Sequence, residues 1–279
     1  MNEAINKSIT STNDARTGER ASYMRPQLVA KEVKRVQNEM KIIPFDGLLT
    51  NKLLSAMSGE EFARLLPYME PVAVSAGDYI YGFGNAVEFV YFPETAVISQ
   101  IHLLEDGNTT EVALIGKEGM VGLSAIFDAP AMNYWTQAIA AGSALRIRAD
   151  VIKEEFARAS SLQQILLSYA SLRIVQISQR AVCNGRHALS GKLCTWLLMI
   201  QDRVGDAQLV LTHEEIARHL GARRASISVA ATYLKDRKII SYNRGHLQIL
   251  DREALINSAC ECYRTLAQYS TSHDNRKNK

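Results

Sequence analysis

Cysteine is scarce in this chain and absent before residue 183. The 279 residues include four cysteines, Cys183, Cys194, Cys260 and Cys262. None forms a Cys-x-x-Cys pair and no histidines accompany them at zinc-finger spacing, so the sequence predicts neither a disulfide framework nor a metal site. We expect free thiols, as is usual in a reducing compartment.

Long apolar runs are also missing. No stretch approaches the ~20 apolar residues that a membrane-spanning helix needs. Residues 1–20 have no apolar core of the kind found in secretory signals. We therefore expect a cytoplasmic protein with no membrane partner, and 279 residues are enough for two domains with their own cores.

Catalytic motifs are not recognisable. We find no nucleophile beside a base, no paired carboxylates and no metal-ligand spacing. Gly82-x-Gly84 and Gly116-Lys117 lack the spacing and the following helix of phosphate-binding loops. We expect no cofactor and no enzyme activity. The alternative is an enzyme or small-molecule-binding protein that uses its C-terminal part as an interaction module.

Charge is divided unevenly along the chain. Residues 41–150 contain 6 Lys and Arg against 13 Asp and Glu, whereas residues 186–279 contain 15 against 9. A basic C-terminal part beside an acidic middle is typical of a nucleic-acid-binding domain joined to a domain with another task.

Two short helices joined by a glycine are predicted in the basic part. Thr212 begins a Thr-x-x-Glu capping box, and Gly221 can end the first helix with a positive φ. The second helix is expected from about Arg223 to Lys235, with an apolar stripe on one side. This pair predicts a helix-turn-helix, whose second helix enters the major groove of DNA.

The first turn of that second helix carries Arg223 and Arg224. Cations there face the positive end of the helix dipole, which costs about 0.3–1 kcal/mol each. An external polyanion would offset this repulsion, and arginine is the usual bidentate partner of guanine. A solvated arginine pair is the alternative. We predict contacts with double-stranded DNA from both arginines and from four further residues: Thr212, His213, Ser226 and Ser228.

Residues 239–250 are predicted to form a β-hairpin whose turn contains Gly245. This hairpin would be the wing of a winged helix. Arg244 and His246 at its tip are candidates for contacts with phosphate or with the minor groove, and an ordinary exposed turn is the alternative.

The block from about Ala188 to Leu255 resembles the DNA-binding domain of the Crp/Fnr family of bacterial transcription regulators. The resemblance depends on the order Thr-x-x-Glu-Ile-Ala, Gly, Arg, Ser-Ile-Ser. It implies that Arg224 contacts bases. The next position, often glutamate in the family, is Ala225, which can at most touch a thymine methyl. The N-terminal cysteines that hold iron–sulfur in oxygen-sensing members are missing.

Between residues 71 and 148 short β-rich runs alternate with turn signals, after a helical pattern over residues 50–69. Asp106-Gly107-Asn108 predicts a β-hairpin. About eight such runs favour a closed β-roll or jelly roll. Their order resembles the cyclic-nucleotide-binding domain of Crp/Fnr proteins.

The expected ligand chemistry is missing from that domain. In members that bind cyclic nucleotides, a glutamate takes the ribose hydroxyl and an arginine neutralises the phosphate. Leu123 stands at the glutamate position, and no Lys or Arg occurs from Gly119 to Leu145. A buried phosphate without a cation is costly, so the resemblance implies the fold without its usual ligand. Leu123, Tyr134 and Trp135 are candidates for lining another effector pocket, with core packing as the alternative.

A long helix is predicted over residues 159–187, with two apolar stripes. The first comprises Leu162, Ile165, Leu166, Tyr169 and Leu172, and the second comprises Leu167, Ala170, Ile174, Ile177 and Ala181. The β-roll can cover one stripe and a twin helix the other. We predict a homodimer through residues 160–183 and a roughly palindromic DNA site. The resemblance to Crp/Fnr proteins implies a hinge at residues 185–188, about which the DNA-binding domain would swing. RNA polymerase is a further candidate partner.

The predicted fold class is α+β, with an N-terminal β-roll or jelly roll with flanking helices, a long dimerisation helix and a C-terminal winged helix-turn-helix. The predicted domains are a largely disordered extension (1–44, with a short helix near 27–40), the β-roll (45–158), the dimerisation helix (159–187), the winged helix (188–256), and a C-terminal helix and tail (257–279).

Overall fold

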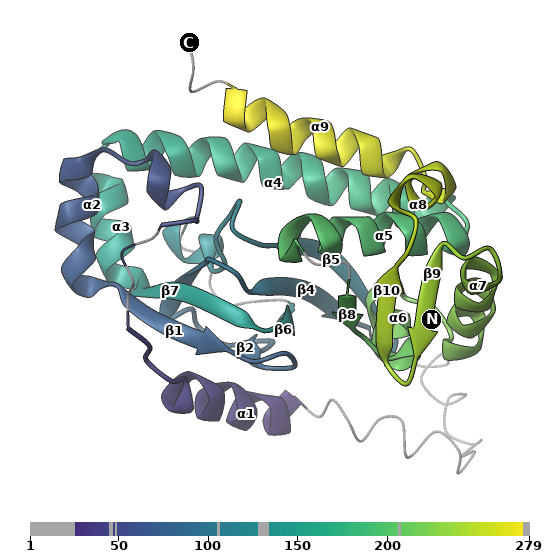
Figure 1. Cartoon of the computed structure of the whole chain (residues 1–279). Helices are drawn as coiled ribbons and strands as arrows, with labels where there is room; N and C mark the ends of the chain where they lie inside the picture. The colour runs from purple at the N-terminus through teal and green to yellow at the C-terminus, as the bar shows by residue number, and fades with distance from the viewer. Residues whose placement is uncertain are drawn as a thin grey trace, which may run out of the picture.

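A computed structural model describes residues 26–44, 47, 49–104, 107–127, 134–205 and 208–275 (Figure 1). It confirms the α+β fold class. A β-roll occupies one end, a winged helix occupies the other, and a single long helix runs past both (Figure 1). No helix within these ranges is both long and apolar enough to cross a membrane.

The β-roll consists of two antiparallel sheets. One has the order β1 (Glu70–Val74), β7 (Gly142–Arg148), β3 (Phe89–Pro93). The other has the order β2 (Tyr79–Tyr81), β6 (Trp135–Ala140), β4 (Val97–Leu103), β5 (Thr109–Ile115). β4 and β5 form the predicted hairpin, with Gly107 at φ +81°. These seven strands are slightly fewer than the number expected, and apolar residues from both sheets fill the space between them.

The helix α1 (Pro26–Glu39) packs against β2. Its Val33, Val36 and Met40 side chains are buried against the roll, and Gln37 Nε2 donates a hydrogen bond to Ile80 O (2.9 Å). The short helix predicted near residues 27–40 is therefore present, and its apolar stripe packs on the β-roll. Residues 1–25 lie outside the described residues.

The helical pattern over residues 50–69 does not form one helix. It is divided into η2 (Leu54–Ala56), α2 (Gly59–Leu65) and η3 (Leu66–Tyr68). Ser58 starts α2 through a capping box with Glu61, and Pro67 lies in η3. A side-chain cap inside the pattern competes with a continuous helix, which explains the break.

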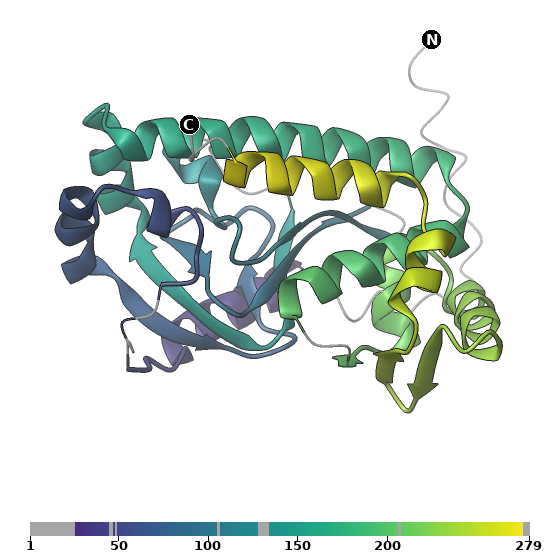
Figure 2. The same ribbon diagram turned by 45° about the horizontal axis from the view of Figure 1, so that its top comes forward.

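After α3 (Ala149–Ala157), the helix α4 (Ser161–Arg186) spans the length of the molecule (Figure 2). Four members of its first apolar stripe are buried against the β-roll: Leu162, Leu166, Tyr169 and Leu172. Four members of the second stripe are exposed: Leu167, Ile174, Ile177 and Ala181. Ala170 is half-buried.

The C-terminal domain contains α5 (Leu189–Val204), α6 (His213–Leu220), α7 (Arg224–Asp236) and α8 (Arg252–Ser258). Its sheet has the order β8 (Gln208–Val210), β10 (His246–Ile249), β9 (Ile240–Asn243). The core is formed by Trp196, Ile216, Ile227 and Leu247 with their neighbours.

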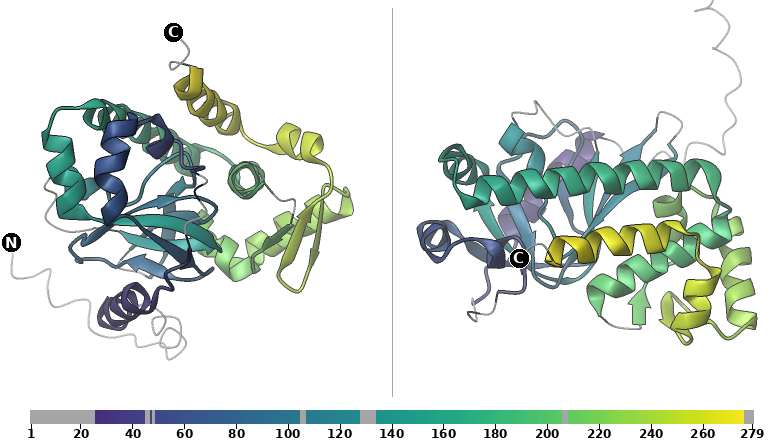
Figure 3. Two further views of the ribbon diagram at one scale, coloured as in Figure 1. Left: turned by 60° about the vertical axis from the view of Figure 1, so that its left-hand side comes forward. Right: turned by 90° about the horizontal axis from the view of Figure 1, so that it is seen from above.

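The chain after Leu250 forms two helices. α8 begins after its cap, Asp251, whose Oδ1 accepts a hydrogen bond from Ala254 N (2.9 Å). α8 ends at Ser258, and α9 (Cys262–Asn275) then turns back to lie beside α4 (Figures 2 and 3). Residues 270–275 continue α9, while residues 276–279 lie outside the described residues.

Candidate nucleic-acid interface

The helix-turn-helix forms as its local signals predict. Thr212 Oγ1 accepts a hydrogen bond from Glu215 N (3.2 Å), while the Glu215 carboxylate accepts one from Thr212 N (2.7 Å). Gly221 ends α6 in the left-handed region at φ +59°. A Cβ atom there would lie 3.3 Å from Thr109 O of the β-roll, so glycine satisfies both the backbone conformation and a close approach.

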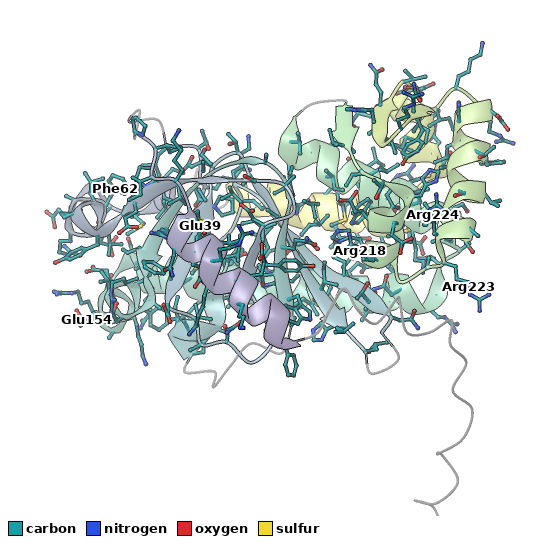
Figure 4. The ribbon with its side chains drawn as sticks, turned by 90° about the horizontal axis from the view of Figure 1, so that it is seen from below. Glu39, Phe62, Glu154, Arg218, Arg223 and Arg224 are labelled. Carbon is teal, nitrogen blue, oxygen red and sulfur yellow. The ribbon has the colours of Figure 1, made fainter. Side chains whose placement is uncertain are left out.

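Arg223 and Arg224 lie at the exposed start of α7. In Figure 4 the Arg223 side chain points away from the protein. Across the described ranges, no carboxylate forms a salt bridge with either guanidinium, and the first turn of α7 has no acidic residue. The electropositive helix start is therefore left without an internal counter-charge, which makes it suited to an external anion.

The outward face of α7 continues this surface with small and apolar side chains. Ala225 and Ser226 are exposed, and Val229 is 73% exposed one turn further along. An apolar side chain at the centre of a surface helix has no partner within the domain. Contact with a thymine methyl is the form of base recognition open to such side chains. The sequence analysis did not single out Val229, because only its exposure distinguishes it from the buried residues of α7.

The predicted wing is also present. β9 and β10 pair with Asn243 opposite His246, and the two residues between them, Arg244 and Gly245, have φ values of +48° and +86°. Positive φ at both central positions is typical of the tight hairpin turn that matches strand twist. The Arg244 and His246 side chains are exposed at the tip.

His213 and Ser228 differ from the other predicted contacts because their side chains lie within hydrogen-bonding distance of each other inside the domain. His213 Nδ1 lies 2.9 Å from Ser228 Oγ, and the ring stacks on Tyr242 at 4.2 Å between centroids. Burial lowers the pKa of His213, and the Arg224 charge lowers it further. The neutral ring therefore links α6, α7 and the wing. Thr212 is exposed, but its hydroxyl also donates a hydrogen bond to Glu215 Oε2 (2.7 Å).

The three residues proposed for an effector pocket lie in different surroundings within the β-roll. Trp135 is 1% exposed, packed with Tyr79 and covered by Val33 of α1. Leu123 packs in another apolar cluster, and the half-buried Tyr134 ring lies against His102. α1 covers Trp135, so core packing, the alternative, describes this residue, whereas an effector pocket at Leu123 and Tyr134 stays a prediction.

A cavity of about 280 Å³ lies between the β-roll, α4, α5 and α9. Its lining includes five basic residues, Lys52, Lys117, Arg173, Arg180 and Arg203, together with the acidic Glu118 and Asp202. The sequence offered no cation that could pair with a phosphate from Gly119 to Leu145, but Arg173 lies outside that range. Its Nη2 donates a hydrogen bond to Gln100 Oε1 (2.8 Å) and its Nη1 to Gln176 Oε1 (2.9 Å). An arginine from α4 therefore reaches the β-roll, held by two amides.

The four cysteines form no disulfide with one another, but three of them lie close together. Cys183, Cys260 and Cys262 meet beside His187. Cys183 and His187 form a Cys-x-x-x-His pattern, and Cys260 and Cys262 form a Cys-x-Cys pattern. Neither is the Cys-x-x-Cys pattern by which metal sites are usually recognised in a sequence. Because the halves are more than 70 residues apart, only the fold shows that they belong together.

Comparisons with known proteins agree with this architecture. A model of the cyclic nucleotide-binding domain matches residues 71–159, and a model of the Crp-like helix-turn-helix domain matches residues 191–258. Curated protein sequences yielded no match.

Solved structures give the same fold at low sequence identity. One from Eubacterium rectale, described as a transcriptional regulator of the Crp/Fnr family, is 18% identical with a TM-score of 0.61, covering 75% of this chain and 97% of that one. FixK2 from Bradyrhizobium japonicum is 19% identical with a TM-score of 0.59, covering 69% and 98%. The c-di-GMP-responsive regulator CLP of Xanthomonas campestris is 13% identical with a TM-score of 0.58, covering 69% and 99%. With both of its characteristic domains present in their usual order, the chain belongs to the Crp/Fnr family of transcription regulators.

Proposed function

We propose that this protein is a homodimeric transcription regulator that binds a specific, roughly palindromic DNA sequence through α7 and the wing. The observation that carries the proposal is the exposed pair Arg223 and Arg224, which have no acidic partner among the described residues. A major groove placed against this helix start supplies both phosphates and guanine edges.

The side chains divide into two groups by their reach. We place Arg224 and Ser226, on the outward face of α7, in contact with bases. Val229 would contact a thymine methyl. The proposed contacts with the sugar–phosphate backbone of the DNA are Arg223, Thr212 and the wing residues Arg244 and His246. His213 and Ser228 contribute by holding α6, α7 and the wing together.

The exposed stripe on α4 supports the homodimer. Leu167, Ala170, Ile174, Ile177 and Ala181 follow the 3-4-3-4 spacing of a coiled-coil seam. Ile174 is 67% exposed in the single chain, so a second copy of α4 would cover a surface that otherwise faces water. Two-fold symmetry then places two α7 helices on related half-sites. RNA polymerase bound at the same DNA is a further proposed partner. The proposed location of the protein is the cytoplasm.

The β-roll is proposed to work without the usual cyclic-AMP contacts, and the protein without enzyme activity. No cation lies in residues 119–127 or 134–145, and Arg173 is already engaged by two amides. Because the related regulator CLP is c-di-GMP-responsive, the fold accommodates effectors other than cyclic AMP. The effector here is either a different molecule or absent.

Selection of binding sequences from random double-stranded DNA tests the proposal. We expect enrichment of a two-fold symmetric motif, and affinity for it that falls steeply between two salt concentrations. The same selection with added cell metabolites would identify an effector. Failure to enrich any motif, with binding that is weak at low salt, would favour the alternative of an enzyme or carrier whose winged helix binds protein.

A further inference from the structure

Four potential metal ligands converge where the winged-helix domain begins and ends. Cys183 lies in the last turn of α4 and His187 is the residue that caps it. Cys260 lies between α8 and α9, and Cys262 is the first residue of α9. The three sulfur atoms and a ring nitrogen of His187 all lie within 4.8 Å of one another.

The distances between these atoms suit a single tetrahedral ion. Cys183 Sγ is 3.6 Å from Cys260 Sγ, and Cys262 Sγ is 3.4 Å from His187 Nδ1. Zinc–sulfur and zinc–nitrogen bonds of usual length give tetrahedron edges of about 3.8 Å for two sulfurs and about 3.6 Å for sulfur and nitrogen. The sulfurs are too far apart for a disulfide, whose bond is about 2.05 Å. They are also too close together to surround several iron atoms and their bridging sulfides.

Polar groups surround the cluster in the manner of outer ligands at known metal sites. His187 Nε2, the nitrogen that points away from the sulfurs, lies 3.0 Å from Glu261 Oε1. A carboxylate on the far nitrogen fixes the tautomer and orientation of a metal-binding imidazole. Gln179 Nε2 donates a hydrogen bond to Cys262 Sγ (3.0 Å), and Thr195 Oγ1 lies 3.0 Å from Cys260 Sγ.

We propose that Cys183, His187, Cys260 and Cys262 bind one zinc ion in a closed Cys3His site. Three thiolates and an imidazole select a borderline-soft divalent cation over magnesium, calcium or manganese, which prefer oxygen ligands. Four protein ligands leave no open position, which is characteristic of a structural site and not of a catalytic one.

The position of the site in the chain indicates what the ion does. Residues 183–187 lead into the winged-helix domain and residues 260–262 leave it, so one ion ties together the two ends of the segment 188–259. It also lies at the predicted hinge between α4 and α5. The winged helix also contributes to an apolar core that it shares with Val97 and Leu114 of the β-roll, so the ion would add to an existing packing and restrict movement at this joint.

Metal analysis of the purified full-length protein tests this directly and requires no DNA. After reconstitution with Zn²⁺ under reducing conditions and removal of excess metal, we expect about one zinc ion per chain. Cys262→Ser and His187→Ala should each weaken zinc binding at least about tenfold in competition with a chelator. Cys194→Ala is the matched control, because Cys194 is buried in the same domain outside the cluster and should leave the zinc content unchanged.

Cobalt substitution keeps the proposal testable if the variants fail to fold. Wild-type protein loaded with Co²⁺ should show the intense visible bands of a tetrahedral thiolate site together with a sulfur-to-cobalt charge-transfer band. Weak octahedral bands, a zinc content near zero in the reconstituted wild type, or loss of zinc in Cys194→Ala equal to that in Cys262→Ser would each overturn the proposal. So would a Cys183–Cys260 disulfide that forms under the same reducing conditions.

Discussion

The carboxylate of Glu111 on β5 lies 3.1 Å from Nδ1 of His219 on α6, which connects the β-roll directly to the first helix of the helix-turn-helix. Glu111 is fully buried and is also 3.2 Å from Arg180 Nη2 of α4. Trp196 Nε1 of α5 donates to it at 3.0 Å. One carboxylate thus joins the β-roll, the long helix α4 and two helices of the winged-helix domain.

Replacing this carboxylate should destabilise the protein strongly. Glu111→Gln keeps the shape of the side chain but leaves the buried Arg180 guanidinium without its counter-charge, and removing one partner of a buried ion pair costs about 3–5 kcal/mol. We expect a loss of this size in the free energy of unfolding, measured by urea denaturation.

Glu154→Gln provides the control, because Glu154 is exposed on α3 at the opposite end of the molecule (Figure 4). It should change the free energy of unfolding by less than about 0.5 kcal/mol. Equal losses of unfolding free energy in the two variants would show that the buried network around Glu111 stabilises the protein no more than an exposed carboxylate does.

The same network predicts a dependence of stability on pH. Burial raises the pKa of Glu111, but hydrogen bonding to His219 and the Arg180 charge outweigh it, so the pKa lies below the ordinary 4.5. A carboxyl whose pKa is lowered by folding stabilises the protein above its ordinary pKa. That contribution is lost as pH falls from 4.5 through the lowered value. Between pH 5 and 3, wild type should therefore lose stability more steeply than Glu111→Gln; parallel profiles would contradict this.

Features with short-range causes could be predicted from the sequence. The capping box at Thr212, the left-handed Gly221 and the hairpin around Arg244-Gly245 each depend on residues within a few positions of one another. The two stripes of α4 were predictable for the same reason, because helical spacing alone places them on different faces.

Features that depend on distant partners could not be predicted. Glu111 is an ordinary strand residue until the fold brings Arg180 and Trp196, 69 and 85 residues away, to its carboxylate. Trp135 was a candidate pocket residue because nothing near it in the sequence covers it. The helix that does so, α1, lies more than 90 residues earlier in the chain. The break between α8 and α9 contains no glycine or proline from which it could be predicted. This break places Cys260 beside Cys183.

The cap at Thr212 makes a second stability prediction. Thr212→Ala removes the hydroxyl that bonds to Glu215 at the start of α6 and should cost about 0.5–2 kcal/mol. Thr212→Ser keeps the hydroxyl and should retain most of the stability. Chemical denaturation of the three proteins measures both effects, and an equal loss for Ser and Ala would mean that the cap is not the cause.

Arg224 offers the sharpest test of base recognition. On the selected operator, Arg224→Ala should weaken binding by about 1–3 kcal/mol, with a much smaller loss on random DNA, because phosphate contacts are shared by both. Arg224→Lys keeps the charge and loses the bidentate fork, so it should resemble Ala on the operator and wild type on random DNA. Fluorescence titrations at constant salt measure these affinities.

Arg158→Ala is the control for removal of a positive charge, because Arg158 is exposed at the end of α3 in the β-roll domain. Its affinity for both DNAs should equal that of wild type. If Arg224→Ala weakens binding to operator and random DNA by the same amount, Arg224 contacts phosphate and another residue distinguishes the bases.

The exposed stripe of α4 predicts which substitution separates the subunits. Ile174→Glu places a charge at the centre of the proposed seam, where a desolvated carboxylate without a partner is costly. Ser168→Glu adds the same charge to an exposed position of α4 outside the stripe. By sedimentation equilibrium, we expect the mass of a dimer for wild type and Ser168→Glu, and that of a monomer for Ile174→Glu. A monomeric Ile174→Glu should also bind an isolated half-site no worse than wild type does, since its α7 is unchanged. A variant that stays dimeric would place the subunit interface on another surface.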